Sequence, residues 1–304
     1  MRILAWIGAA VVAWGIVCVW YYFRQESIIF QPSRLATSHE FRFDRPFEEH
    51  WIEVEPGVEL NALLFPASAS RATQRPESTD VSPAGNPVVL YLHGNAGHLQ
   101  DWGWHADLYV EARHDFLVID YRGYGKSGGR IESEAQLHAD IDRVWKWTTA
   151  RYDPADVTLV GYSLGAALAA RLACESEPPP ARLVLLASFY SARDLARRLV
   201  PYVPIGLLRY PLRTDLALSE CRHDLPIAIF HGEGDRTVPF SQGRRLAELL
   251  GSRARLIPLP DATHQDIAAD PLFRREMARL LNRNGESRSP APGTRTTPGE
   301  TPDG

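Results

Sequence analysis

Hydrophobic and polar positions alternate along the second half of the chain in a way that predicts strands followed by helices. Short runs rich in valine, isoleucine and leucine are typical of strands buried on both faces, and longer amphipathic or alanine-rich stretches between them predict helices. The predicted strands are Val88–Leu92, Phe116–Asp120, Val157–Val160, Leu183–Ala187, Ile227–Phe230 and Arg255–Leu259. The predicted helices are Leu99–Arg113, Glu132–Arg151, Ser163–Glu175, Ser241–Leu250 and Asp266–Asn282.

This order of elements predicts an α/β fold with a mostly parallel central sheet and helices on both of its faces. Two earlier apolar stretches, His50–Val54 and Val58–Phe65, are joined at Pro56-Gly57, a dipeptide typical of turns. We expect them to form an antiparallel hairpin at one edge of the sheet.

The N-terminal stretch Ile3–Phe23 carries no charged residue and is bracketed by Arg2 and Arg24. A helix of this length crosses a hydrocarbon layer of about 30 Å, so the stretch predicts a transmembrane helix. A cleaved signal peptide is the alternative, but Gln25-Glu26-Ser27 offers no small-residue cleavage site. The balance of charge around the helix favours a cytoplasmic N-terminus, with the bulk of the chain on the non-cytoplasmic side.

The composition is that of an ordinary globular protein and excludes only a few classes of function. The formal net charge of −4 argues against a nucleic-acid-binding protein, and 45% of the residues are hydrophobic. The three cysteines are too scattered for a metal site or a disulfide framework. Because Cys18 lies in the apolar N-terminal run, at most Cys174 and Cys221 could pair, and we expect both to be free buried thiols.

Candidate chemistry centres on Gly161-Tyr162-Ser163-Leu164-Gly165, which lies between a predicted strand and a predicted helix. A G-x-S-x-G sequence in that context holds its serine on a sharp turn, with the hydroxyl exposed above the sheet. The two glycines remove side chains that would collide in such a turn. The sequence therefore predicts Ser163 as a nucleophile.

Two other loops that follow predicted strands supply the partners that a serine nucleophile needs. Asp235 follows the strand Ile227–Phe230 and His264 follows Arg255–Leu259, which gives the chain order serine, aspartate, histidine. The histidine would take the serine proton and return it to the leaving group, and the carboxylate would orient the imidazole. Glu233 is the alternative carboxylate.

The tetrahedral intermediate of such a reaction needs backbone N–H groups that stabilise its oxyanion. Leu164 follows the nucleophile, and Asn95 lies in the glycine-rich loop after the strand Val88–Leu92, so we expect their N–H groups to form the oxyanion hole. No cofactor and no metal ion is expected. His98 and His105 lack the spacing of a zinc-binding helix, and the segment 123–129 lacks a phosphate-binding signature.

Several motifs together support a family assignment. They are Phe30-Gln31-Pro32, HGNAG at 93–97, DYRGYGKS at 120–127, GYSLG at 161–165, HGEGDRTVP at 231–239 and His264. Over roughly Phe41–Arg283 the chain resembles the α/β-hydrolase superfamily, and within it the N-terminally membrane-anchored serine hydrolases that include monoacyl lipases and protein depalmitoylases. The resemblance implies a structural role for the segment 120–127. Thr263 and Gln265 depart from the residues common beside the histidine.

Hydropathy and composition along the chain give a domain division. We expect a membrane anchor with its flank at 1–26, a connector at 27–46, an α/β-hydrolase domain at 47–284 and a disordered tail at 285–304. Within the domain, the Pro- and Ser-rich segment 66–87 predicts a mobile surface insertion. The apolar, proline-interrupted segment 188–225 predicts a short cap above the site, although packing over the sheet edge is an equal alternative.

The cap and the anchor together favour a lipid-like or acylated substrate, with Phe189, Tyr190 and Tyr162 as candidate substrate contacts. The leading hypothesis is a membrane-anchored serine hydrolase that cleaves ester or thioester bonds through an acyl-enzyme on Ser163. A peptidase or amidase with the same triad is the alternative, and a binding protein without turnover is a third. The expected partners are the acyl substrate and the membrane, with no nucleic acid and no obligate protein partner.

Overall fold

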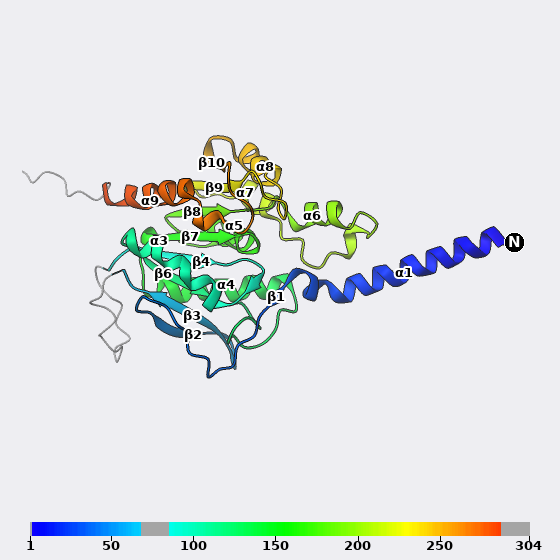
Figure 1. Ribbon diagram of the computed structural model, residues 1–304, viewed down its shortest axis with the longest axis horizontal. Coiled ribbons are helices and arrows are strands. Elements are labelled where there is room, and N and C mark those ends of the chain that lie inside the picture. Colours follow the sequence, from blue (N-terminus) through cyan, green and yellow to red (C-terminus); the bar gives the residue numbers. More distant parts are fainter. Residues whose placement is uncertain (1, 68–84, 287–304) are drawn as a thin grey trace, which may run out of the picture.

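The computed structural model describes residues 2–67 and 85–286, which form one long N-terminal helix and an α/β body (Figure 1). Helix α1, Arg2–Ile29, runs away from the body as a single rod. Within the described ranges it is the one helix long and apolar enough to cross a membrane. The helix includes the predicted span Ile3–Phe23 and continues past the predicted end of the anchor region at residue 26.

An eight-stranded sheet forms the centre of the body, in the order β10-β9-β8-β7-β4-β6-β3-β2. The six neighbouring strands β10, β9, β8, β7, β4 and β6 pair in parallel, whereas β3 is antiparallel to both β2 and β6. The strands are β2 (Glu48–Glu55), β3 (Val58–Phe65), β4 (Val88–Leu92), β6 (Asp115–Ile119), β7 (Val157–Tyr162), β8 (Arg182–Leu186), β9 (Ile227–Gly232) and β10 (Ala254–Leu259). A separate parallel pair joins β1 (Gln31–Pro32) to β5 (Ala96–Gly97).

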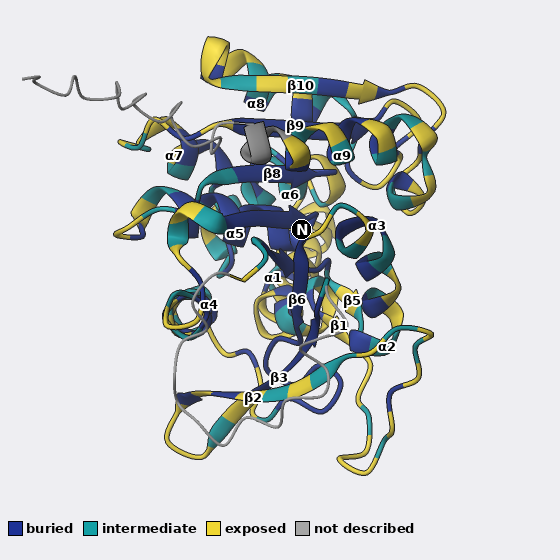
Figure 2. Ribbon diagram, turned by 90° about the vertical axis from the view of Figure 1, so that its left-hand side faces the viewer, coloured by how far each residue is buried: buried dark blue, intermediate teal, exposed yellow. Residues whose placement is uncertain are grey.

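Helices cover both faces of this sheet because successive strand residues point to opposite sides. In β4, for example, Leu90 and Leu92 belong to one apolar cluster and Val89 and Tyr91 to the other. The first cluster is covered by α4 (Glu134–Thr149), α5 (Leu164–Glu175), α7 (Thr214–Ser219) and α8 (Ser241–Leu250), and the second by α2 (Leu99–Trp102), α3 (Ala106–Glu111) and α9 (Pro271–Glu286). Figure 2 shows the central strands as the most buried part of the body.

The predicted fold class is confirmed, since the sheet is mainly parallel, both faces carry helices and the hairpin lies at the edge. Two predicted helices differ from the structure. The helix predicted at Leu99–Arg113 is interrupted by a 3₁₀ turn, η1 (Gly103–His105), where the Phe43 ring lies against Gly103 and leaves no room for a side chain there. The last helix begins at Pro271, since proline disfavours a helical conformation at the residue before it.

Four further 3₁₀ turns are η2 (Pro154–Asp156), η3 (Ile205–Leu207), η4 (Gly251–Arg253) and η5 (Ile267–Ala269). The predicted cap segment, 188–225, contains η3, α7 and a short helix, α6 (Ala192–Leu199). Pro201, Pro204 and Pro211 all lie outside its helices, in line with the predicted interruptions. The predicted insertion at 66–87 and tail at 285–304 fall mostly outside the described residues.

The expectation of free thiols at Cys174 and Cys221 is wrong, because the structure joins them in a disulfide. Cys174 lies near the end of α5 and Cys221 lies just after α7, and these two helices pack against each other. Their Cα atoms are 4.7 Å apart, which suits a disulfide. A separation of 47 residues in the sequence gave no sign of this proximity.

Candidate active site

Ser163 occupies the turn between β7 and α5 in a backbone conformation that serine rarely adopts. Its φ of 51° and ψ of −107° place it in the left-handed half of backbone space. Such strain costs about 1–3 kcal/mol and persists only where the surroundings enforce it. Here the Ser163 N–H donates to the carbonyl of Leu186 on the neighbouring strand, at 2.9 Å. The side chain is thereby presented at the carboxyl end of β7.

Gly161 and Gly165 make this turn possible because neither position has room for a side chain. A Cβ on Gly161 would lie 2.3 Å from the carbonyl oxygen of Gly165, and a Cβ on Gly165 would lie 1.9 Å from that of Leu92. Both contacts are with backbone atoms, which cannot move aside cheaply. The helix that begins at Leu164 therefore packs directly against β4 and β7.

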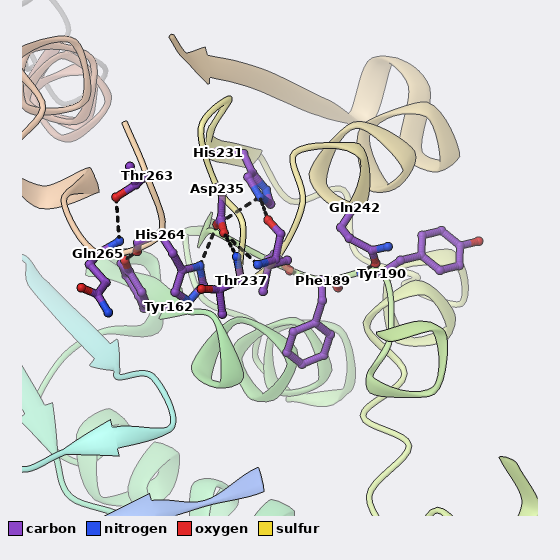
Figure 3. Close-up of polar contacts among 12 residues, drawn as sticks. Tyr162, Phe189, Tyr190, His231, Asp235, Thr237, Gln242, Thr263, His264 and Gln265 are labelled. Atoms are coloured by element: carbon purple, nitrogen blue, oxygen red, sulfur yellow. Dashed lines mark hydrogen bonds and ion pairs between the residues drawn. The ribbon is translucent and has the colours of Figure 1, made fainter. Parts of the chain in front are cut away.

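His264 and Asp235 form a hydrogen-bonded pair at the same edge of the sheet. Nδ1 of His264 lies 2.7 Å from Oδ2 of Asp235. Figure 3 marks this contact with a dashed line. The other oxygen of Asp235 accepts the backbone N–H groups of Thr237 and Val238, at 2.9 and 2.7 Å. The carboxylate is thus held in place, and it fixes the orientation of the His264 ring.

Burial alone would raise the pKa of Asp235, but hydrogen bonds from His231 and His264 outweigh it and lower the pKa to about 2. The carboxylate therefore stays ionised at neutral pH. Glu233, the competing carboxylate, is exposed, and its described hydrogen bond is a backbone one to Leu259. The geometry favours Asp235 as the residue that orients the histidine.

Tyr162 connects the nucleophile turn to the histidine loop. Its hydroxyl donates a short hydrogen bond to the carbonyl of His264, and the two rings meet edge to face with centroids 5.7 Å apart. Since Tyr162 directly precedes Ser163, the structure brings the three loops of the predicted triad to one edge of the sheet. The catalytic roles of Ser163, Asp235 and His264 remain predictions.

The predicted oxyanion residues lie beside Ser163. Asn95 and Leu164 line the same apolar cavity as the serine, which has a volume of about 240 Å³. Asn95 is braced by three hydrogen bonds: its carbonyl accepts the Gln31 N–H and the Tyr124 hydroxyl, both at 2.8 Å, and its side-chain amide donates to Ile29. No described hydrogen bond uses its backbone N–H.

The three predicted substrate contacts lie in different places. Phe189 is buried and lines the cavity beside Ser163. Tyr190 does not line it, because its ring lies 4.0 Å from the guanidinium group of Arg245 on α8. Tyr162 packs beneath His264 and is likewise not among the lining residues. Position supports a substrate contact for Phe189 alone of the three.

The segment 120–127 has the structural role that the resemblance implied. Arg122 donates two hydrogen bonds to Asp140 on α4, at 2.5 and 2.7 Å, and a third to Glu55 on β2. Asp120 is buried beside His93 and accepts the N–H of Leu99 at 3.2 Å. These contacts tie together the loops around the site.

Sequence reasoning missed two sets of residues at the site. The buried ring of His231 lies 3.5 Å from Asp235 and shares its carboxylate with His264; its place in the motif before Asp235 could have indicated this. Residues of α1 also line the cavity, namely Tyr21, Ile28 and Ile29. No signal in the sequence indicates that an anchor helix reaches the site. Within residues 2–67 and 85–286, no cluster of acidic, histidine or cysteine side chains could hold a metal ion.

Comparison with known proteins identifies the family. A family model for the alpha/beta hydrolase fold matches residues 87–217. The protein Rv2307c of Mycobacterium tuberculosis is 30% identical over 84% of this chain and 86% of its own length. The lysophosphatidylserine lipase ABHD12 of Danio rerio is 29% identical over 66% of this chain, which spans 57% of that protein.

The fold has solved counterparts. The esterase Pf2001 of Pyrococcus furiosus superimposes over 84% of this chain and 97% of its own, with a TM-score of 0.57 and 17% sequence identity. At that identity the likeness concerns the fold. The family-model match and the match to Rv2307c show that this chain is also related to the family by sequence. The chain therefore belongs to the α/β-hydrolase family.

Proposed function

We propose that this protein is a membrane-anchored serine hydrolase that cleaves the ester bond of single-chain acyl lipids through an acyl-enzyme on Ser163. One observation carries the proposal: the strained serine opens into an apolar cavity at the sheet edge where His264 is paired with Asp235. The nucleophile and a place for an acyl chain then adjoin each other, and the base lies on a loop at the same edge of the sheet.

The geometry supports acyl transfer in two steps. Since Nδ1 of His264 is bound to Asp235, Nε2 is the ring nitrogen free to take the proton of the Ser163 hydroxyl as its oxygen attacks the ester carbonyl. The N–H groups of Asn95 and Leu164 would stabilise the resulting oxyanion. A donor of this kind typically contributes about 3–4 kcal/mol.

Collapse of the tetrahedral intermediate transfers the proton from His264 to the departing alkoxide and leaves the acyl group on Ser163. A water molecule, deprotonated by His264, then attacks the acyl-enzyme carbonyl, and the carboxylic acid leaves as Ser163 recovers its proton. Throughout, the ionised Asp235 stabilises the protonated imidazole. The reaction consumes one ester and one water and needs no cofactor.

A lipid substrate is favoured by the lining of the cavity and by one relative. The side chains around Ser163 are mainly aliphatic or aromatic, including Phe189, Leu195, Leu199 and Leu208. The related protein from Danio rerio is a lysophosphatidylserine lipase, whose substrate carries a single acyl chain. An apolar cavity next to the nucleophile suits such a chain and would reject a polar peptide segment.

Anchoring in a membrane follows from the surface of α1. Large apolar side chains project from it over most of its length, among them Ile3, Trp6, Val12, Ile16 and Phe23, each more than half exposed. Water would surround this surface at a high free-energy cost, whereas a bilayer would bury it. The disulfide between Cys174 and Cys221 favours an oxidising compartment for the body, in line with the orientation expected from the flanking charges.

Labelling with a fluorophosphonate tests the catalytic proposal. Full-length protein in detergent is expected to be labelled, and Ser163→Ala is expected to abolish both labelling and hydrolysis of 4-nitrophenyl esters. Ser252→Ala, a change at an exposed serine in η4, serves as the matched control and should leave both intact. Labelling that persists in Ser163→Ala would overturn the assignment.

The substrate class is tested with acyl esters, acyl thioesters and amino-acid amides of the same chain length. We expect kcat/KM for the ester of a lysophospholipid to exceed that for the matched amide by several orders of magnitude. Faster hydrolysis of the amide would point to a peptidase or amidase. Binding without turnover of any of the three would point to a protein that has lost catalysis.

A further inference from the structure

The last turns of α1 take part in the cavity beside Ser163. Tyr21, Ile28 and Ile29 line one side of it, and Leu195 and Leu199 of α6 line another. Ser163 and Leu164 lie among the same lining residues. A helix expected only to hold the enzyme at the membrane is therefore also a wall of the site. Figure 1 shows α1 leaving the body beside α6.

A fully buried glutamine joins this end of α1 to the cap. The side-chain amide of Gln25 donates to the carbonyl of Leu207 at 2.6 Å, and its oxygen accepts the N–H of Arg209 at 2.7 Å. A buried amide with both ends paired to backbone groups strongly fixes the position of the segment that it contacts. The cap is thus held at a defined distance from α1.

Other contacts extend this junction in both directions along the helix. Nε1 of Trp14 donates to the carbonyl of Tyr202 at 2.8 Å, deep within the apolar part of α1. At the other end, the hydroxyl of Tyr210 donates to Glu26 at 3.0 Å. The cap therefore follows α1 over three turns of helix and into the region that a bilayer would occupy.

The segment that follows α1 also contacts the loop at residues 93–97, called the oxyanion loop below because it carries Asn95, a predicted oxyanion residue. The carbonyl of Ile29 accepts the side-chain amide of Asn95 at 3.0 Å, and the N–H of Gln31 donates to the carbonyl of Asn95 at 2.8 Å. The pairing of β1 with β5 continues this contact. The anchor is thus connected to the site at two points, its acyl cavity and its oxyanion loop.

We propose that α1 forms part of the acyl-binding site, and that a single-chain lipid enters this site from the bilayer, between α1 and the cap. Leu199 and Tyr202 of the cap are 68% and 61% exposed, and they lie on the side of the body from which α1 leaves. An acyl chain that moves along these residues passes from hydrocarbon to the cavity with little exposure to water. The proposal rests on the proposed function, since it assigns a route to the same substrate.

Substitution of a lining residue on α1 tests the wall. In full-length protein in detergent micelles, kcat/KM is measured for 4-nitrophenyl acetate and for 4-nitrophenyl dodecanoate. The ratio of the dodecanoate value to the acetate value is then compared between variants. Ile28→Trp fills the cavity and is expected to lower that ratio by about tenfold or more, since several methylene groups lose apolar contact. Ile16→Trp makes the same change on the exposed part of α1 away from the cavity, and its ratio should match the wild type.

Ile28→Ala provides a second variant that leaves the helix able to form. It removes contacts without filling space, and we expect a decrease of about threefold in the same ratio. Equal ratios for wild type, Ile28→Trp and Ile28→Ala would overturn the proposal, as would an equal decrease in Ile16→Trp.

The failure of this inference can be told apart from the failure of the proposed function. Suppose that wild-type protein hydrolyses both esters and is labelled at Ser163, yet neither substitution of Ile28 changes the ratio. Then only the assignment of α1 to the acyl-binding site is disproved. If wild-type protein hydrolyses neither ester and resists labelling, the catalytic assignment fails first. The route is then tested by delivering the dodecanoyl ester in vesicles rather than micelles. Lateral entry predicts that Ile28→Trp lowers the ratio of kcat/KM for the long ester to that for the short ester further in vesicles than in micelles.

Discussion

The loops that carry the candidate triad and the junction between α1 and the cap are held together by different means. Ser163, Asp235 and His264 each follow a strand closely, and backbone hydrogen bonds and close glycine contacts fix their positions. The junction instead depends on side chains such as Gln25 and Trp14 that bond to backbone groups more than 180 residues away in the chain. One region is fixed by neighbours in the sheet, the other by long-range contacts.

This difference separates the chemistry of the enzyme from its choice of substrate. Hydrolysis needs a few atoms at fixed distances, which short loops on a buried sheet provide. In the proposed function, selection of an acyl chain would need an apolar surface near the membrane, which the cap and α1 would provide with their exposed apolar side chains. Substitutions in the two regions should therefore have effects of different kind and size.

The largest effect is expected from removing the base. His264→Ala leaves Ser163 without an acceptor for its proton and should lower kcat for ester hydrolysis by about 10⁴-fold or more. The fold should be retained, because the Asp235 carboxylate keeps the N–H groups of Thr237 and Val238. Steady-state kinetics and a thermal melt measure the two quantities. Activity within tenfold of wild type would remove His264 from the mechanism.

A smaller loss of activity is expected from Asp235→Asn, which keeps the size of the side chain but removes its charge. The His264 ring loses its orientation and the imidazolium its stabilisation, so we expect kcat to decrease by about 10²- to 10⁴-fold. Glu233→Gln is the matched control on the exposed part of the same loop, with an expected change of about twofold or less. The reverse pattern would make Glu233 the orienting carboxylate.

At the junction, Gln25→Leu is expected to loosen the cap. The carbonyl of Leu207 and the N–H of Arg209 would lose their partner, at a cost of about 1–3 kcal/mol for each group left buried. Limited proteolysis should then cut within residues 192–212 about tenfold faster. Gln100→Leu is the control, because Gln100 bonds to both backbone groups of Arg42 far from the cap. Equal cap cleavage in both variants would contradict the junction.

The smallest effect concerns pH. The pKa of Asp235 is lowered from 3.8 to about 2, so its contribution to stability is present above pH 3.8 and is lost as the pH falls through about 2. The difference in free energy of unfolding between wild type and Asp235→Asn should stay constant from pH 7 to about 5. It should narrow below that by roughly 2 kcal/mol. Denaturant titrations across this range measure it, and a difference that narrows near pH 6 would indicate another group.

The sequence predicted the sheet well because its signals are local. The parallel strands are short runs rich in valine, isoleucine and leucine, and the turn at Ser163 is specified by glycines that leave no room for side chains. It could not predict that Tyr190 points to Arg245, nor that Tyr21 and Ile28 reach the cavity, because both depend on how distant segments pack. The pairing of Cys174 with Cys221 was missed for the same reason.

That disulfide has a practical consequence for work on the protein. It links the end of α5, the helix that begins next to Ser163, to the chain just after α7, and the whole segment between them is enclosed in a covalent loop. A protease that cuts once between residues 192 and 212 therefore leaves the two fragments joined. On a gel without reductant the nicked enzyme migrates as an uncleaved chain, and only added thiol releases the fragments.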